Sequence, residues 1–262
     1  MTDRSLAGRV AIVSGAGEGI GRSSALALAG DGADVALGAR RPEQLERVAE
    51  EVRALGRRAL CVPTDIADLD RCRALVASTV DAFGRLDALV NVAALSVAES
   101  RVEDVEHGDW QRALDVNLFG TMEVSRACLP HLRSAGGGAI VQISTLSTRT
   151  TPPRLAPYVS AKLAMIGASL SLARDVGRDN IRVNVVVPGY VTGPHLDVLF
   201  AGYAERRGAS VEEVFAEAAG QSVLRRIPSP DDVAEAVLFL ASGRSAGITG
   251  VQIDVNAGLH IP

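Results

Sequence analysis

The stretch that decides the fold is Val10-Ala11-Ile12-Val13-Ser14-Gly15-Ala16-Gly17-Glu18-Gly19-Ile20-Gly21, near the start of the chain. An apolar run of strand length leads into glycines spaced Gly-x3-Gly-x-Gly, and a helical pattern then runs to Ala29. Glycine allows a sharp turn and lets the backbone approach a pyrophosphate, which sits at the N-terminus of the following helix. The chain holds 26 glycines, so the spacing alone is weak, and its place between strand and helix gives it weight. The stretch predicts a dinucleotide-binding turn, and a purely structural turn is the alternative.

Strand-length apolar runs recur along the chain and alternate with longer segments of helical spacing. This alternation predicts right-handed βαβ units, and therefore an α/β fold in which helices cover both faces of a parallel sheet. Helices are expected at Pro42–Leu55 and Asp70–Phe83. Asp231 and Asp232 are expected to cap a further helix that ends near Leu240. The predicted strands are Val10–Ser14, Asp34–Gly38, Ala59–Val62, Leu86–Val90, Ala139–Ser144, Arg182–Val187 and Gln252–Val255.

Composition narrows the class of protein. A chain of 262 residues, of which 47% are hydrophobic, suits one domain over residues 1–262 with a large core. The net charge of -4 and the lack of a basic stripe argue against nucleic acid as a partner. No stretch reaches the roughly 18 apolar residues of a membrane helix, and the N-terminal sequence has no signal-peptide pattern. Cys61, Cys72 and Cys128 lack metal-ligand spacing, so we expect no metal, buried thiols and a cytoplasmic location.

One region departs from the strand and helix alternation. The segment from Tyr190 to Gln221 is long, and its only expected element is a short helix at Val211–Ala219. Long insertions in compact domains are often lids over binding sites, so we expect a substrate lid at about residues 190–222. Its apolar side chains favour a hydrophobic substrate. A surface insertion without a role is the alternative.

The end of the second predicted strand, Gly38-Ala39-Arg40-Arg41, bears on cofactor choice. Enzymes that use NAD usually place a carboxylate here for the ribose 2'-hydroxyl, whereas arginine favours a 2'-phosphate. Arg40 and Arg41 therefore favour NADP(H) over NAD(H). Glu18 in the glycine turn counts against this choice because it would repel the phosphate, and the arginines could also simply face solvent.

Lys162 is the only lysine among 27 basic residues, and it follows Tyr158 by four positions. This spacing places both side chains on one face of a helix, and the preceding Pro157 is typical of a helix start. Acid/base work by a tyrosine near neutral pH requires its pKa to fall by roughly 3 units, or about 4 kcal/mol. An ammonium one turn away stabilises the phenolate, and lysine differs from arginine in being a compact charge whose pKa shifts readily. The pair predicts a catalytic site, and an ordinary exposed pair is the alternative.

Taken together, these motifs resemble those of the classical short-chain dehydrogenase/reductase family along essentially the whole chain. The resemblance rests on motifs in a fixed order: Gly15/Gly19/Gly21, Asp65, Asn91-Val92-Ala93-Ala94, Asn117, Ser144-Thr145, Tyr158/Lys162 and Pro188-Gly189. It implies a Rossmann-type, doubly wound parallel sheet of seven strands with the site at their C-terminal ends. It also implies a homotetramer or homodimer.

The resemblance assigns roles to individual residues. Tyr158 would donate or accept the proton, Lys162 would hold the nicotinamide ribose and tune Tyr158, and Asn117 would order a water that relays protons to Lys162. Asp65 and Ile66 would meet the adenine, and Val191 with Thr192 would approach the carboxamide. The full set of expected cofactor contacts is Gly15, Gly17, Gly19, Ile20, Gly21, Arg40, Asp65, Ile66, Asn91, Ala93, Tyr158, Lys162, Pro188, Gly189, Val191 and Thr192.

Three positions depart from the family pattern. The catalytic serine usually lies 13 residues before the tyrosine, and that position is Thr145 here. Threonine keeps the hydroxyl, whereas Ser144 would point to the opposite face of the strand and Ser147 is a further candidate. The usual Asn-Asn-Ala-Gly is Asn-Val-Ala-Ala here, and Thr192 sits one place earlier than commonly found.

The leading hypothesis is reversible hydride transfer between NAD(P)(H) and a carbonyl or secondary alcohol, with Tyr158 as general acid and base. The expected partner is a small, hydrophobic alcohol or ketone. Two alternatives stay open: a non-catalytic sensor or structural subunit that only binds the cofactor, and a lyase or isomerase on the same fold.

Overall fold

A sheet of seven parallel strands forms the centre of the computed structural model, which describes residues 4–261. The order across the sheet is β3-β2-β1-β4-β5-β6-β7. Every predicted strand is present, with ends that differ by no more than two residues, so the predicted Rossmann-type fold is confirmed. The strands are β1 (Val10–Ser14), β2 (Asp34–Ala39), β3 (Ala59–Pro63), β4 (Ala88–Asn91), β5 (Gly138–Ile143), β6 (Ile181–Pro188) and β7 (Gln252–Val255).

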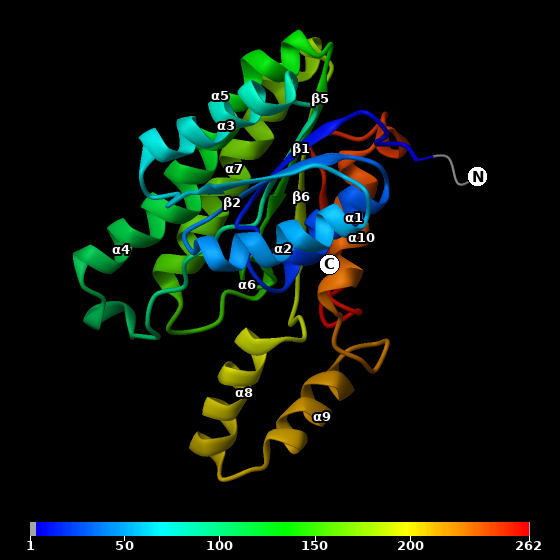
Figure 1. Cartoon of the computed structure of the whole chain (residues 1–262). Helices are drawn as coiled ribbons and strands as arrows, with labels where there is room; N and C mark the ends of the chain where they lie inside the picture. The colour runs from blue at the N-terminus through cyan, green and yellow to red at the C-terminus, as the bar shows by residue number, and fades with distance from the viewer. Residues whose placement is uncertain (1–3, 262) are drawn as a thin grey trace.

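Helices cover both faces of this sheet (Figure 1). Helices α1 (Ile20–Gly30), α2 (Pro42–Ala54) and α10 (Pro230–Ala241) supply apolar side chains to the core on one face. Helices α3 (Leu69–Phe83), α5 (Thr121–Ser134) and α7 (Ala156–Val176) pack on the other face. The five inner strands are buried on both sides and therefore read as continuous apolar runs, which makes them recognisable in the sequence.

The chain reverses its direction of winding at β1, which lies between β2 and β4. Strands β2 and β3 extend the sheet to one side, and β4 to β7 extend it to the other. The loops that follow β1 and β4 therefore diverge at the C-terminal edge of the sheet. A crevice at such a switch point is where doubly wound sheets bind their ligands.

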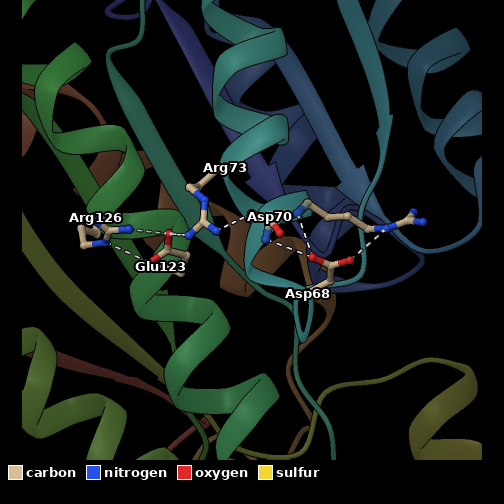
Figure 2. A network of polar contacts seen from close by, with 6 residues as sticks. Asp68, Asp70, Arg73, Glu123 and Arg126 are labelled. Atoms are coloured by element: carbon tan, nitrogen blue, oxygen red, sulfur yellow. Dashed lines mark hydrogen bonds and ion pairs between the residues drawn. The ribbon is translucent and has the colours of Figure 1, made fainter.

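An ion-pair network fixes α3 to α5 (Figure 2). The nearly buried Glu123 carboxylate accepts hydrogen bonds from Arg73 at 2.5 Å and from Arg126 at 2.7 Å, and these bonds lower the pKa of Glu123. Arg73 also pairs with Asp70, and Asp68 caps the N-terminus of α3 by accepting the backbone N–H of Asp70 at 3.0 Å. The network holds in place the helix that continues from the segment carrying Asn117.

The predicted lid region contains two helices rather than one. Helix α8 (Pro194–Arg207) was missed, and α9 (Val211–Gln221) extends the predicted short helix by two residues. The two form a hairpin that projects from the C-terminal edge of the sheet (Figure 1). Leu196, Phe200 and Ala204 recur every fourth residue and face α9 in a small apolar core of their own. The apolar face of α8 is hard to recognise in the sequence, because the apolar residue Val198 lies on the opposite, exposed side of the helix.

Two further sequence predictions need correction. The N-cap of α10 is Ser229, whose hydroxyl accepts the backbone N–H of Asp232 at 3.2 Å, because Asp231 and Asp232 already lie in the first turn. Cys72 and Cys128 are buried free thiols, but Cys61 is partly exposed because β3 is an edge strand. Within residues 4–261, no helix combines the length and apolar character needed to cross a membrane.

Candidate active site

The glycine turn after β1 is packed tightly on one side and open on the other. A Cβ atom at Gly15 would lie 2.3 Å from the backbone nitrogen of Ala93, and one at Gly21 would lie 2.0 Å from the Gly15 carbonyl oxygen. Both positions therefore exclude any side chain. At Gly19, where φ is +71°, nothing lies within 4 Å of the position that a Cβ would take. The turn thus presents bare backbone to the crevice beside β4.

No side chain caps the N-terminus of α1, and no acidic residue lies in the first turn of this helix. Its N-cap is Gly19, and its first turn begins at Ile20. The first N–H groups of a helix otherwise need a partner, and the helix dipole favours a negative one. The open turn and this uncapped N-terminus together fit a pyrophosphate group.

The side chains at the adenosine end of the crevice are exposed. Arg40 and Arg41 follow β2, and neither makes an ion pair in the described part of the chain. Glu18 is exposed as well. Asp65 is exposed and accepts the backbone N–H of Ala67 at 3.1 Å, and Ile66 is buried. The structure thus gathers the predicted adenosine contacts at one edge of the sheet.

Asn91 lies differently from the other predicted cofactor residues. Its side chain is buried and donates to the Ser125 hydroxyl on α5 at 3.1 Å. It therefore serves the packing of α5 on the sheet, and only its backbone reaches the crevice. Ala93 forms the wall against Gly15, with its N–H bound to the Ser14 carbonyl at 3.0 Å.

Thr145 and Tyr158 come together at the C-terminal end of β5. Tyr158 lies in the first turn of α7, where burial raises the pKa of the phenol and hydrogen bonding with Thr145 partly offsets that rise. The fall in the Tyr158 pKa that the sequence led us to expect is therefore not found, because burial outweighs the groups that favour the phenolate. The Thr145 hydroxyl also accepts the backbone N–H of Ser147 at 3.2 Å and lies 3.3 Å from the Ser147 hydroxyl. Ser144, by contrast, is buried, and its hydroxyl has no hydrogen-bond partner within residues 4–261.

Lys162 is one turn along α7 from Tyr158 and is only 2% exposed. Its ammonium donates to the carbonyl oxygen of Ile143, the last residue of β5, at 2.9 Å. Burial lowers the pKa of Lys162 to about 8. The lysine is thus still largely charged at neutral pH, although it lies in the interior between α7 and β5.

Asn117 lies in a π-helical segment, Asp115–Gly120, between α4 (His107–Leu114) and α5. Its side chain is fully buried, donates to the carbonyls of Leu95 at 2.8 Å and Ala113 at 2.9 Å, and accepts the Leu95 N–H at 3.2 Å. Single π-turns inside α-helices often mark functional sites. Because both amide hydrogens of Asn117 are used within the protein, a water ordered by this residue would have to donate to one of its carbonyl oxygens.

The predicted carboxamide contacts follow β6. Pro188 ends the strand, and a Cβ at Gly189 would lie 2.8 Å from the Asn256 Cβ. Val191 packs on the core beside α1, and the Thr192 N–H binds the Pro228 carbonyl at 2.9 Å. These residues connect the end of β6 to the start of α8. The sequence signal for α8 is the recurrence of its buried residues Leu196, Phe200 and Ala204 at every fourth position.

Fold and site together define a dinucleotide-binding α/β protein with a Thr, Tyr and Lys group at the edge of the crevice. A family model described as Enoyl-(Acyl carrier protein) reductase matches residues 15–260. The short chain dehydrogenase/reductase astE of Aspergillus oryzae is 36% identical over 259 residues, which are 98% of this chain and 97% of that protein. The chain belongs to the short-chain dehydrogenase/reductase family of oxidoreductases.

Solved structures agree with this assignment. Carveol dehydrogenase from Mycobacterium avium in complex with NAD superposes with a TM-score of 0.92 at 32% identity, covering 97% of this chain and 98% of that one. L-Sorbose reductase from Gluconobacter frateurii, complexed with NADPH and L-sorbose, gives a TM-score of 0.94 at 28% identity over 100% of both chains. Structures of the same fold thus hold either nicotinamide cofactor.

Proposed function

We propose that this chain catalyses reversible hydride transfer between NADP(H) and the carbonyl or secondary alcohol of a small hydrophobic substrate. The observation that carries the proposal is the meeting of Tyr158 with the Thr145 hydroxyl, one helical turn from the buried Lys162 and beside an open glycine turn. A protein that only bound the cofactor would have no need for this group.

The crevice fits a dinucleotide, because the turn from Gly15 to Gly21 is open backbone and the N-terminus of α1 lacks an internal anion. These groups would hold the pyrophosphate, Asp65 and Ile66 the adenine, and Val191 and Thr192 the carboxamide. When bound, the nicotinamide supplies or accepts the hydride.

The side chains of the site transfer the proton and bind the substrate oxygen. Burial raises the pKa of Tyr158, so the phenol is protonated at neutral pH and can donate to a carbonyl oxygen during reduction. The Thr145 hydroxyl holds that oxygen by a hydrogen bond. Lys162, with its pKa at about 8, lowers the free energy of the phenolate that remains. In alcohol oxidation the same phenolate takes the proton back.

The direct test is to follow the absorbance of NADPH and NADH separately while a panel of ketones is offered to the protein, with the reverse reaction tested on the matching secondary alcohols. Consumption of reduced cofactor that depends on the ketone supports the proposal. Tight cofactor binding without turnover on any panel member would instead favour the binding protein that only senses the cofactor.

Thr145 should be the hydroxyl that holds the substrate oxygen. Thr145→Ala is expected to lower kcat about 10²-fold, the typical effect of losing one donor to a developing oxyanion. Thr145→Ser should retain most activity because it keeps the hydroxyl. Steady-state kinetics of both variants and of Ser147→Ala show which hydroxyl holds the substrate oxygen. Normal turnover by Thr145→Ala together with loss in Ser147→Ala would move the role to Ser147.

Arg40 should set the cofactor preference. Arg40→Gln is expected to lower kcat/KM for NADPH about tenfold or more and to leave NADH within about twofold, because only the 2'-phosphate loses charge-assisted hydrogen bonds. Arg47→Gln is the matched control, since Arg47 is an exposed arginine further along α2. Equal losses for the two cofactors would count against a 2'-phosphate site.

Three further features belong to the same proposal. The chain would work as one catalytic domain over residues 1–262, with residues 190–222 as the substrate lid. We also propose a homotetramer or homodimer and a cytoplasmic location. Light scattering would measure the assembly directly.

A further inference from the structure

The π-helical segment Asp115–Gly120, here called the π-turn, touches the loop of residues 64–68 that follows β3. The contact is made by Gly120, which is buried. A Cβ atom at Gly120 would lie 2.0 Å from the carbonyl oxygen of Ile66 and 2.7 Å from its Cγ1. The two backbones therefore meet with no side chain between them, and only glycine fits at this position.

The backbone of Gly120 gives no other reason for a glycine. Its φ of -63° and ψ of -44° are ordinary helical angles that any residue adopts. Glycine inside a helical stretch lowers the stability of the helix, because its unfolded backbone has more conformational freedom to lose. Alanine would be the more stable choice if the Ile66 carbonyl lay further away. The close approach therefore accounts for the glycine.

The π-turn is the more firmly held of the two segments. Asn117 fixes it by three side-chain hydrogen bonds of 2.8 to 3.2 Å. The Thr121 hydroxyl donates to the Val116 carbonyl at 3.3 Å. One turn further along α5, two arginines hold the Glu123 carboxylate (Figure 2).

The loop after β3 is held by weaker contacts. Within residues 4–261 the Ile66 carbonyl accepts only the Cys72 thiol, a weak donor, at 3.3 Å, and the Ile66 N–H has no hydrogen-bond partner. Asp65 is exposed, and its carboxylate accepts the Ala67 N–H. A side chain at position 120 would therefore displace Ile66 and leave the π-turn in place.

We propose that Gly120 is a positioning residue for the adenine half of the cofactor. Its bare Cα lets the loop after β3 rest against the π-turn, where the free Ile66 N–H and the Asp65 carboxylate can meet the acceptor and donor groups of the base. The inference rests on the proposed function and deepens it. The π-turn then serves the site twice, because Asn117 holds the loop after β4 and Gly120 holds the loop after β3.

Gly120→Ala tests the proposal, because its Cβ pushes the Ile66 carbonyl back by more than about 1 Å before an ordinary contact is reached. We expect KM for NADPH and for NADH to rise by similar factors of about tenfold, since both carry adenine, while kcat at saturating cofactor stays within about twofold. Arg40→Gln, by contrast, should affect NADPH alone. Gly108→Ala is the matched control, since Gly108 lies in α4 and nothing lies within 4 Å of its Cβ position.

The split between KM and kcat distinguishes positioning from a loss of stability. A variant that is only less stable has less active protein, so its apparent kcat falls and its KM stays the same. Circular dichroism and the melting temperature report the folded fraction. Unchanged KM values for both cofactors in a folded Gly120→Ala variant, or a fall in kcat alone, would overturn the role of Gly120.

ADP separates this inference from the proposed function, because it carries the adenine but cannot transfer a hydride. Calorimetry should show that ADP binds the wild-type protein and binds Gly120→Ala about tenfold more weakly. If this holds while no ketone is turned over, the positioning role stands and the catalytic proposal fails. No binding of ADP to the wild-type protein, or equal binding to both proteins, would overturn the role.

Hydrogen exchange on the wild-type protein gives a test that does not depend on the folding of the variant. Because the loop after β3 rests on the π-turn, ADP should slow amide exchange in residues 64–68 and also in residues 115–121. Protection of residues 64–68 alone would show that the two segments are not coupled and would contradict the proposal.

Discussion

Tyr158→Phe is expected to lower turnover on the order of 10³-fold while cofactor affinity stays close to that of the wild-type protein. The variant keeps the ring and its packing in the first turn of α7 and removes only the hydroxyl that meets Thr145. General acid/base groups typically contribute 10² to 10⁴ to the rate. Stopped-flow turnover with the best ketone, together with cofactor titration by fluorescence, measures both quantities.

The pH dependence gives this prediction a second readout. Because burial raises the pKa of Tyr158, the wild-type protein should reduce ketones best at neutral pH and oxidise alcohols better as the pH rises. The residual activity of Tyr158→Phe should lose this dependence. Circular dichroism and the melting temperature control for folding. Near-normal turnover in a folded variant would contradict the role of Tyr158.

Lys162→Met is expected to abolish most activity and, at the same time, to stabilise the protein without cofactor. The fold holds Lys162 with its pKa at about 8, below the ordinary value of 10.5, because burial disfavours the charged form. The unfolded chain then binds more protons than the folded one between these pH values, so the wild-type protein gains stability as pH rises through them. Below pH 8 the buried charge of Lys162 lowers the free energy of unfolding by its full amount, about 3 kcal/mol.

Removing the ammonium also leaves the Ile143 carbonyl without its donor, which costs about 1 kcal/mol. We therefore expect Lys162→Met to raise the free energy of unfolding by about 2 kcal/mol near pH 7, with the gain shrinking as the pH approaches 10.5. Urea unfolding at several pH values measures it. A variant less stable than the wild-type protein near pH 7 would show that the buried charge is not costly.

Lys162→Arg separates charge from shape in the same experiment. The guanidinium keeps the positive charge but is larger and planar, and it does not deprotonate. The lysine head lies 2.9 Å from the Ile143 carbonyl and the residue is only 2% exposed, so a larger head would have to displace its neighbours. We expect activity to stay low in this variant although the charge is preserved. Full activity would mean that any cation serves beside Tyr158.

Much of the fold and part of the site were predictable because their signals are local. The seven strands and several of the helices between them, among them α2, α3 and α10, follow from apolar periodicity, and the Gly15 to Gly21 turn follows from its place after β1. The Tyr158 and Lys162 pair follows from helical geometry, since residues four apart share a face. Helix α8 had a local signal too, in Leu196, Phe200 and Ala204, but it was blurred by apolar residues elsewhere on the helix.

The sequence by itself determined the order of elements, the glycine turn and the singular lysine, because each depends on residues a few positions apart. Only the tertiary structure decided the order β3-β2-β1-β4-β5-β6-β7, the burial of Asn91 against α5, and the close approach of Gly120 to the Ile66 carbonyl. The hydrogen bond from Asn91 to α5 joins residues 34 positions apart. Periodicity carries no information over such distances, because the packing of helices on the sheet selects which loops come together.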